Sequence, residues 1–268
     1  MSSLARTPAP ALEAFSRQST SFDEIDADNP IIARMRAISR KAALKHMRAG
    51  DRLLELNAGT GLDSLYFAAQ GIRVLSTDAA PGMIERIRAK RAENPDLPIE
   101  VMECSFLDLH RLGDRQFQHV FSNFGGLNCT PNLDLALKGI DRVLLPGGTC
   151  TLVIMPQFSP WEVLGIAKGH FRLAFRRFTR GGAQAHLEGM LFKCHYYSPS
   201  YVRHHLGPRY DLLQLRALSL LTPPPHHDRF ATEHPGTFHR LEQLEERVAH
   251  RWPFRGWGDH FLITLRKR

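Results

Sequence analysis

Short apolar runs alternate with amphipathic segments along residues 52–155 of the chain. Each apolar run is followed by apolar positions at helical spacing, so the period changes repeatedly between strand-like and helix-like. Strands are predicted at residues 52–56, 72–76, 99–103, 117–122 and 149–155, with helices between them at residues 62–70, 81–93 and 132–145. Strands joined by helical crossovers run parallel. The pattern therefore predicts an α/β sheet with helices on both faces.

The two flanks of this alternation are patterned less regularly. Residues 1–29 are rich in Ser, Ala and Pro and predict little regular structure, and a helix is expected at residues 31–47 behind Pro30. Beyond Pro156 an aromatic and basic stretch runs to Tyr197. Further elements are a helix at 199–206, a strand at 211–220, a helix at 237–250 and a last strand at 260–265. We therefore expect seven strands, mostly parallel, with insertions after the fifth strand and before the last.

Composition adds a basic surplus to this picture. The 268 residues are 43% hydrophobic and 23% charged, as in ordinary globular proteins, and the net charge of +8 suits an acidic partner without naming one. The cysteines, Cys104, Cys129, Cys150 and Cys194, have no C-x-x-C spacing, so neither a metal site nor a disulfide framework is expected. The sequence contains no apolar run that predicts a signal peptide or a membrane span, which favours a cytoplasmic protein.

Part of the positive charge is arranged as a repeat. Lys168, Arg172, Arg176 and Arg180 recur every fourth residue, so on a helix they would share one face. The commoner interpretation of such a stripe is the solvated face of an amphipathic helix. The alternative is a docking face for an anionic substrate, a carrier protein or nucleic acid.

A glycine-containing turn follows the first strand, and an acidic residue ends the second. Gly59 and Gly61 lack Cβ atoms, which lets the backbone turn sharply and approach a ligand. Asp78 stands at the carboxyl end of the second strand, where a carboxylate can bind both hydroxyls of a ribose. This arrangement predicts a nucleoside-containing cofactor. A nicotinamide-binding domain is disfavoured, because the residues after Gly61 do not complete G-x-G-x-x-G spacing.

Residues 51–155 resemble the class I S-adenosylmethionine-dependent methyltransferases. The first motif of that family, E/D-x-G-x-G-x-G, aligns with Glu55-Leu-Asn-Ala-Gly-Thr-Gly61, with Asn57 in place of the first glycine. The strand-end acid of the family aligns with Asp78, and further motifs match at residues 104–109, 122–128 and 144–148. The resemblance implies a Rossmann-like sheet, S-adenosyl-L-methionine as the cofactor and methyl transfer as the reaction.

The resemblance also implies a set of cofactor-binding residues. Asp78 would bind the ribose hydroxyls, Met83 would pack against adenine, and Ser105 would lie near the adenine amino group. The fourth-strand motif would approach the methionine part of the cofactor. The implied binding residues are Glu55, Asn57, Ala58, Gly59, Gly61, Asp78, Ala79, Met83, Ser105, Phe106, Ser122 and Asn123.

The acceptor pocket is expected from the segments that flank the core. We expect a single domain made of an N-terminal lid and helix (1–48), a cofactor-binding core (51–156), substrate-capping insertions with one core strand (157–258) and a final strand (259–268). Phe15 and Phe22 resemble the aromatic lid residues of small-molecule methyltransferases. Packing of both rings against the first helix is the alternative.

Three residues are candidates for the chemistry. Asn128 follows the fourth strand and is expected to face the methyl group, and His195 and Tyr196 could supply a base or an aromatic wall. We expect a small-molecule acceptor, because the fourth-strand motif lacks the Asn/Asp-Pro-Pro-Tyr/Phe signature of enzymes that methylate base or amide nitrogens. The alternatives are an RNA or carrier-tethered acceptor and a non-catalytic cofactor-binding protein. The sequence does not say whether O, N or C receives the methyl group.

Overall fold

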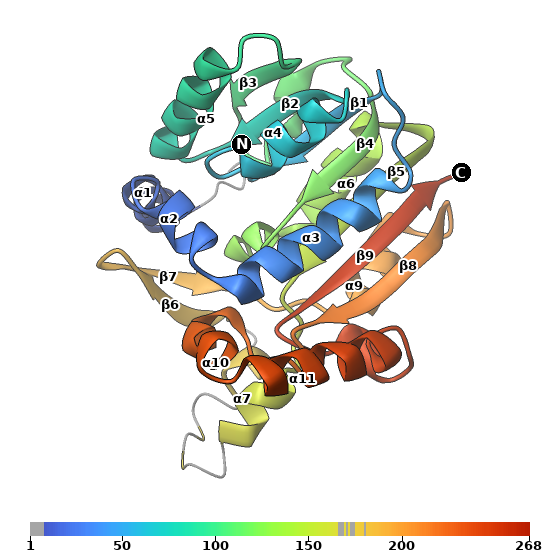
Figure 1. Ribbon diagram of the computed structural model, residues 1–268. Coiled ribbons are helices and arrows are strands. Elements are labelled where there is room, and N and C mark those ends of the chain that lie inside the picture. The colour runs from blue at the N-terminus through green and yellow to red at the C-terminus, as the bar shows by residue number, and fades with distance from the viewer. Residues whose placement is uncertain (1–7, 166–168, 170, 172–174, 180) are drawn as a thin grey trace.

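A twisted seven-stranded sheet with helices on both faces forms the centre of the fold (Figure 1). The computed structural model describes every residue except 1–7, 166–168, 170, 172–174 and 180. In the described part the strand order is β3-β2-β1-β4-β5-β9-β8. The strands are β1 (Arg52–Leu56), β2 (Arg73–Asp78), β3 (Ile99–Glu103), β4 (Phe117–Ser122), β5 (Leu144–Ile154), β8 (Tyr210–Leu218) and β9 (His260–Lys267).

All strands of this sheet except β9 run in one direction. β1 pairs in parallel with β2 and β4, whereas β9 pairs antiparallel with both β5 and β8. The first five strands are parallel because a helix or a helical turn carries the chain back between successive strands. The predicted Rossmann-like, mostly parallel sheet of seven strands is confirmed.

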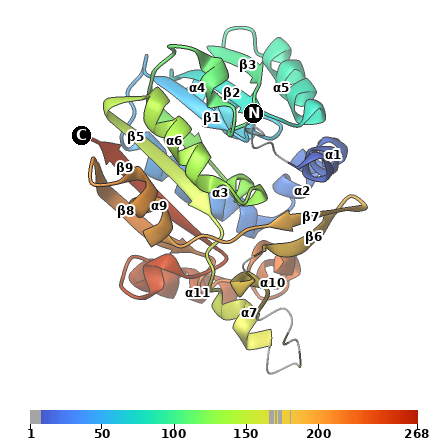
Figure 2. The ribbon, with the colours of Figure 1, turned by 180° about the vertical axis from the view of Figure 1, so that it is seen from behind.

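The helices divide between the two faces of the sheet. α3 and α4 cover one face (Figure 1), and α6 and α9 cover the opposite face (Figure 2). α10 and α11 lie beyond the end of the sheet at which β9 begins. The helices are α1 (Ala9–Gln18), α2 (Phe22–Ala27), α3 (Pro30–Leu44), α4 (Leu62–Ala69), α5 (Pro81–Glu93), α6 (Leu133–Val143), α7 (Pro160–Leu164), α9 (Pro199–Leu206), α10 (Asp228–Glu233) and α11 (Pro235–Val248).

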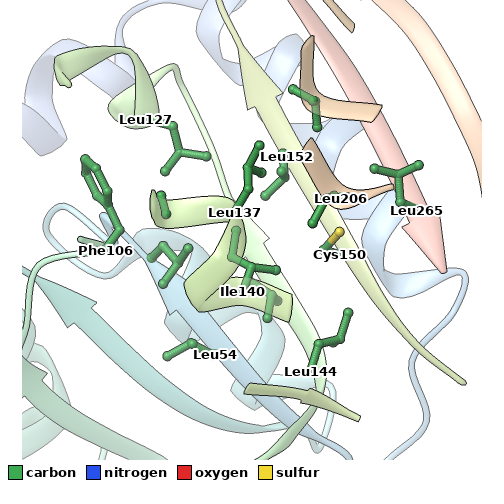
Figure 3. Packing of buried hydrophobic residues seen from close by; sticks show 14 of the residues in the cluster. Leu54, Phe106, Leu127, Leu137, Ile140, Leu144, Cys150, Leu152, Leu206 and Leu265 are labelled. Carbon is green, nitrogen blue, oxygen red and sulfur yellow. The ribbon is translucent and has the colours of Figure 1, made fainter. Parts of the chain in front are cut away.

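The largest apolar cluster fills the space between the sheet and α6. Leu137 and Ile140 point from α6 toward Leu54 of β1 and Leu152 of β5, as Figure 3 shows. All four side chains are fully buried. The spacing of the apolar residues in α6 gives one continuous stripe, and the strands beneath are apolar on both faces because helices cover both. Burial of this stripe holds β1, β4 and β5 in register.

The N-terminal flank differs from the prediction. Residues 9–18 and 22–27, expected to have little regular structure, form α1 and α2. α1 buries Ala11 and Ala14 and packs against α5 and β7. The prediction was wrong because the helix is stabilised by this tertiary contact, which its weak local pattern does not reveal.

The segment after β5 contains an unpredicted β-hairpin. β6 (Ala183–Leu187) and β7 (Met190–Cys194) pair antiparallel around Glu188 and Gly189, which have φ values of 48° and 75°. Two successive residues with positive φ are typical of the tight turns that join such strands. The hairpin lies beside α1 and not in the main sheet (Figures 1 and 2).

Most of the predicted basic stripe lies outside the described residues, namely Lys168, Arg172 and Arg180. Its fourth member, Arg176, begins a short 3-10 turn and forms an ion pair with Glu162. Among the described helices, none combines the length and the apolar character needed to cross a bilayer.

Candidate functional site

A cavity of about 310 Å³ lies at the carboxyl ends of the parallel strands. The predicted cofactor-binding residues that line it are Asn57, Gly59, Asp78, Ala79, Met83, Phe106 and Asn123. A larger depression of about 580 Å³ lies where β1 to β4 begin, and none of the predicted site residues lines it. Ligands of open α/β sheets bind at the carboxyl ends, so the smaller cavity is the candidate site.

Asp78 shapes the wall of this cavity at the end of β2. Its Oδ2 accepts a hydrogen bond from the N–H of Gly59 at 2.9 Å, and its Oδ1 accepts one from the N–H of Ala80 at 2.9 Å. Burial raises the pKa of the Asp78 carboxyl to about 6. Each oxygen has a lone pair left after one backbone hydrogen bond, so the carboxylate can still accept both hydroxyls of a ribose.

Asn57 occupies the position at which the resembling family has its first glycine. The residue has a φ of 43°, in the left-handed region that Asn tolerates. Its Nδ2 donates to the carbonyl oxygen of Asn123 at 3.0 Å, and its Oδ1 accepts from Ser122 Oγ at 2.6 Å. Gly126 makes room for this side chain, since a Cβ on Gly126 would lie 2.5 Å from Asn57. The departure from the family motif therefore ties the turn after β1 to the end of β4.

Glu55, the acidic residue of the first motif, lies beneath the cavity and does not line it. Its carboxyl accepts a hydrogen bond from Ser64 Oγ. Burial and the nearby Asp63 carboxylate raise the pKa of Glu55 to about 8. Asp63 itself stays ionised, because Arg36 and Arg40 outweigh the effect of burial and lower its pKa. Glu55 is therefore the member of this buried pair that holds a proton at neutral pH.

Replacement of Glu55 by glutamine is expected to remove a pH-dependent loss of stability. The folded-state pKa of about 8 exceeds the ordinary pKa of a glutamate carboxyl, 4.5, so the stabilisation from protonated Glu55 is complete below pH 4.5 and is lost as pH rises through 8. Glu55→Gln should match wild type near pH 5 and exceed its free energy of unfolding by about 3–5 kcal/mol at pH 9. Urea unfolding at both pH values measures this. Parallel pH profiles for the two proteins would contradict it.

The buried ion pairs of α3 reach the wall of the cavity through Asn123. Its Nδ2 donates to Asp63 Oδ2 and to Ser39 Oγ, both at 3.0 Å. Asp63 also accepts hydrogen bonds from Arg36 Nη1 and Arg40 Nε, each at 2.6 Å. This network fixes the loop after β4 to α3.

Four other predicted residues lie beside the cavity without lining it. Ala58 donates its N–H to Thr77, and Gly61 has a φ of 85° and faces Ile87 across the turn. Ser105 Oγ accepts from the N–H of Leu107 at 3.1 Å. Ser122 donates to Asn57 as described above. Their contacts are those of residues that shape the turns around a ligand.

The structure brings the three residues proposed for the chemistry close together but places only Tyr196 on the wall of the cavity. Asn128 is fully buried; its Oδ1 accepts from the N–H of Met155, and its Nδ2 donates to the carbonyls of Met155 and His195. Neither Asn128 nor His195 lines the cavity, whereas Tyr196 does. The expected position of Asn128 facing a methyl group is therefore corrected, because its polar atoms clamp β5 to the segment after β7.

Further walls come from segments outside the predicted binding set. Phe22 approaches Gly59, and Phe15 of α1 packs on Phe192 of the hairpin with ring centroids 5.8 Å apart. The placement of Phe15 and Phe22 agrees with the lid interpretation. The hairpin side adds Ala185, Phe192, Cys194 and Arg176. The Glu188-Gly189 pair is the one local signal that could have revealed the hairpin.

Polar side chains of α2 bind the glycine turn, α5 and α3. Asp23 accepts a hydrogen bond from Thr60 Oγ1 at 2.5 Å and forms an ion pair with Lys90 at 2.6 Å. Asp26 pairs with Arg36 of α3. These contacts hold Phe22 against the glycine turn, so α2 forms part of the cavity wall.

Comparison with known proteins identifies the core of the chain. Residues 53–148 match the family model described as a methyltransferase domain. A demethylmenaquinone methyltransferase of Beutenbergia cavernae is 31% identical over 152 residues, and one of Clavibacter sepedonicus is 34% identical over 125 residues. The matches cover 53% and 46% of this chain, and 60% and 47% of the relatives, so the chain spans only about half the length of these curated relatives.

The fold is shared with solved methyltransferases over nearly the full chain. The 1,6-didemethyltoxoflavin-N1-methyltransferase of Burkholderia thailandensis, solved with 1,6-didemethyltoxoflavin and S-adenosylhomocysteine, is similar with a TM-score of 0.60 and 17% identity, covering 100% of this chain and 92% of that one. A putative S-adenosylmethionine-dependent methyltransferase of Listeria monocytogenes has a TM-score of 0.56, 16% identity, and coverage of 87% and 99%. Residues 53–148 therefore match a methyltransferase domain, and the chain shares the fold of solved methyltransferases.

Proposed function

We propose that the whole protein transfers a methyl group from S-adenosylmethionine to a small-molecule acceptor. The observation that carries this proposal is the continuity of one covered cavity. Asp78 and Gly59 line the same cavity as residues of α1 and of the β6–β7 hairpin. An acceptor that reaches the cofactor beneath these segments must be small. The named activities of the toxoflavin and demethylmenaquinone relatives support the same class of acceptor.

The residues around the cavity fit the cofactor in their chemistry. Asp78 offers two acceptor oxygens for the ribose, while Met83 and Phe106 offer apolar surface for the adenine. The glycine-rich loop after β4, with Gly125 and Gly126, leaves room for the methionine part. When bound, the cofactor supplies a methyl group on a positively charged sulfur, which is a good leaving group. The chain then has to align the acceptor and exclude water.

The N-terminal lid would exclude water from the site. Phe15, Phe22 and Phe192 line the cavity with apolar rings, which disfavour water beside a bound cofactor. Tyr196 is the one candidate of the three for the chemistry that lines the cavity. We therefore propose Tyr196 for the acceptor wall, whereas Asn128 and His195 stand behind the wall of the cavity.

Transfer of labelled methyl groups tests the proposal. Purified protein is incubated with S-adenosylmethionine labelled in its methyl group and with separated low-mass, RNA and protein fractions of a cell extract. Label is expected in the low-mass fraction, with loss of transfer in Asp78→Ala and retention in the exposed variant Asp96→Ala. Label confined to RNA or protein would favour a macromolecular acceptor. Binding of the cofactor without transfer to any fraction would favour the non-catalytic alternative.

The macromolecular alternative depends on the predicted basic stripe, of which only Arg176 is described. Arg176 lines the cavity and pairs with Glu162. This orientation supports a role inside the site and weakens the case for a docking face. The expected cytoplasmic location stays a prediction.

A further inference from the structure

The cavity wall near the hairpin is mostly apolar and contains a few polar side chains. Phe15, Phe192, Ala185 and Met155 provide the apolar surface. Besides Asn57, Asn123 and Asp78, the polar side chains that line the cavity, among the described residues, are Arg176, Tyr196, Cys129 and Cys194. Asp78 is the one carboxylate among the described lining residues, and it belongs to the end of β2. The polar groups facing an acceptor are therefore a guanidinium, a phenol and two thiols.

The uncharged members of this set carry their protons at neutral pH. Burial raises the pKa of the Tyr196 phenol to about 12 and that of the Cys194 thiol to about 11. Burial likewise raises the pKa of Cys129 far above its usual range. Tyr196 can therefore donate a hydrogen bond to an acceptor molecule, and no lining group on this side is poised to receive a proton.

Arg176 shares its counter-ion, Glu162, with the neighbouring Arg177. Its Nε and Nη2 donate to Glu162 at 3.1 and 2.6 Å. Glu162 Oε1 also accepts from Arg177 Nε at 2.8 Å, and Arg177 is paired in addition with Asp259. The Nη1 group of Arg176 makes no hydrogen bond to any described residue. This nitrogen is available to a ligand, and the carboxylate of Glu162 fixes the plane of the guanidinium that carries it.

We infer that the methyl acceptor is a small apolar molecule bearing an oxyanion, and that Arg176 and Tyr196 bind this oxyanion. The inference rests on the proposed function and narrows its acceptor class. An oxyanion suits a site with a cation and a hydroxyl donor, because charge-assisted hydrogen bonds are stronger than neutral ones. A cationic amine would meet Arg176 and find no carboxylate among the described lining residues on this side. Apolar walls select a hydrophobic body for the same molecule.

A pair of matched ligands tests the inference without knowledge of the natural acceptor. Benzoate and its neutral isostere benzamide are titrated into the protein saturated with S-adenosylhomocysteine, and binding is followed by ligand-observed NMR. Benzoate is expected to bind at least about tenfold more tightly than benzamide. Arg176→Gln should abolish this preference, Tyr196→Phe should reduce it, and Arg176→Lys should keep part of it. Arg203→Gln, an exposed arginine on α9, should leave it unchanged.

The outcomes distinguish this inference from the proposed function. Equal binding of the two ligands, binding of neither, or a preference that survives in Arg176→Gln would overturn the inference while cofactor binding remains intact. Failure of the wild-type protein to bind S-adenosylhomocysteine would instead remove the proposed function. Thermal melting of each variant shows that a loss of preference is not a loss of folding.

Discussion

Replacement of Asp78 by alanine is expected to weaken S-adenosylhomocysteine binding by about 1–3 kcal/mol, roughly 5- to 150-fold in Kd. The carboxylate is the charged acceptor at the end of β2, and it also receives the N–H groups of Gly59 and Ala80. Its loss removes the partner of the ribose hydroxyls and leaves two backbone donors of the cavity wall unpaired. Isothermal titration calorimetry at pH 7.5 measures the change.

The same site predicts how affinity depends on pH. Burial raises the pKa of Asp78 to about 6 in the free protein, so below this pH one carboxylate oxygen becomes a donor and is lost as an acceptor. Affinity of the wild type should therefore fall as pH drops through 6, while the alanine variant should show no such fall. Asp96→Ala, which removes an exposed carboxylate, is the matched control for charge. An unchanged Kd in Asp78→Ala, or a flat wild-type profile between pH 8 and 5, would count against the assignment.

Replacement of Arg177 by methionine is expected to lower the free energy of unfolding by about 3–5 kcal/mol. Arg177 is only 3% exposed and donates to Glu162 Oε1, to Asp259 Oδ1 and to the carbonyls of Pro156 and Asp259. Burial alone would raise the pKa of Asp259, but His260 and Arg177 outweigh it and hold the pKa well below its usual range. The variant leaves this charge buried with one partner fewer.

Thermal unfolding gives the measurement for Arg177. A loss of this size corresponds to a fall in melting temperature on the order of 10 °C for a chain of this length. Arg176→Met is the control, because that side chain is 36% exposed and Glu162 keeps Arg177 as a partner when Arg176 is removed. The control should lose about 1 kcal/mol or less. Equal melting temperatures for the two variants would show that the buried pairs do not stabilise the fold as argued.

The order of the first five strands could be predicted from the sequence because their signals are local. A strand covered on both faces by helices is apolar along its length, and the following helix shows its own period within a few residues. Pro81 and Gly61 mark helix boundaries where the structure has them. Asp78 and Gly59 could be found for the same reason, since both stand at strand ends that the pattern locates. The predicted bounds of β1, β3 and β4 coincide with the observed ones, whereas β5 begins at Leu144 and not at residue 149 as predicted.

The N-terminal lid and the hairpin could not be predicted in the same way. α1 is stabilised by contacts with β7 and α5, and β7 is distant from α1 in the chain. Short helices and isolated hairpins are marginally stable by themselves, so their formation depends on the surface they cover. Phe15 meets Phe192 only because both elements fold onto the open side of the sheet.

The sequence by itself predicted the class of fold and the strand-end carboxylate and, through the family resemblance, the cofactor. Tertiary structure alone decided which polar residues face the cavity. Asn128 stands beside the motif of β4, yet its side chain is saturated by Met155 and the backbone of His195. Arg176 belongs to a repeat that suggested a surface helix, yet it lines the cavity beside Tyr196. The physical reason is that backbone periodicity is set by neighbours in the chain, whereas the burial and hydrogen-bond partners of a polar side chain come from residues far away in sequence.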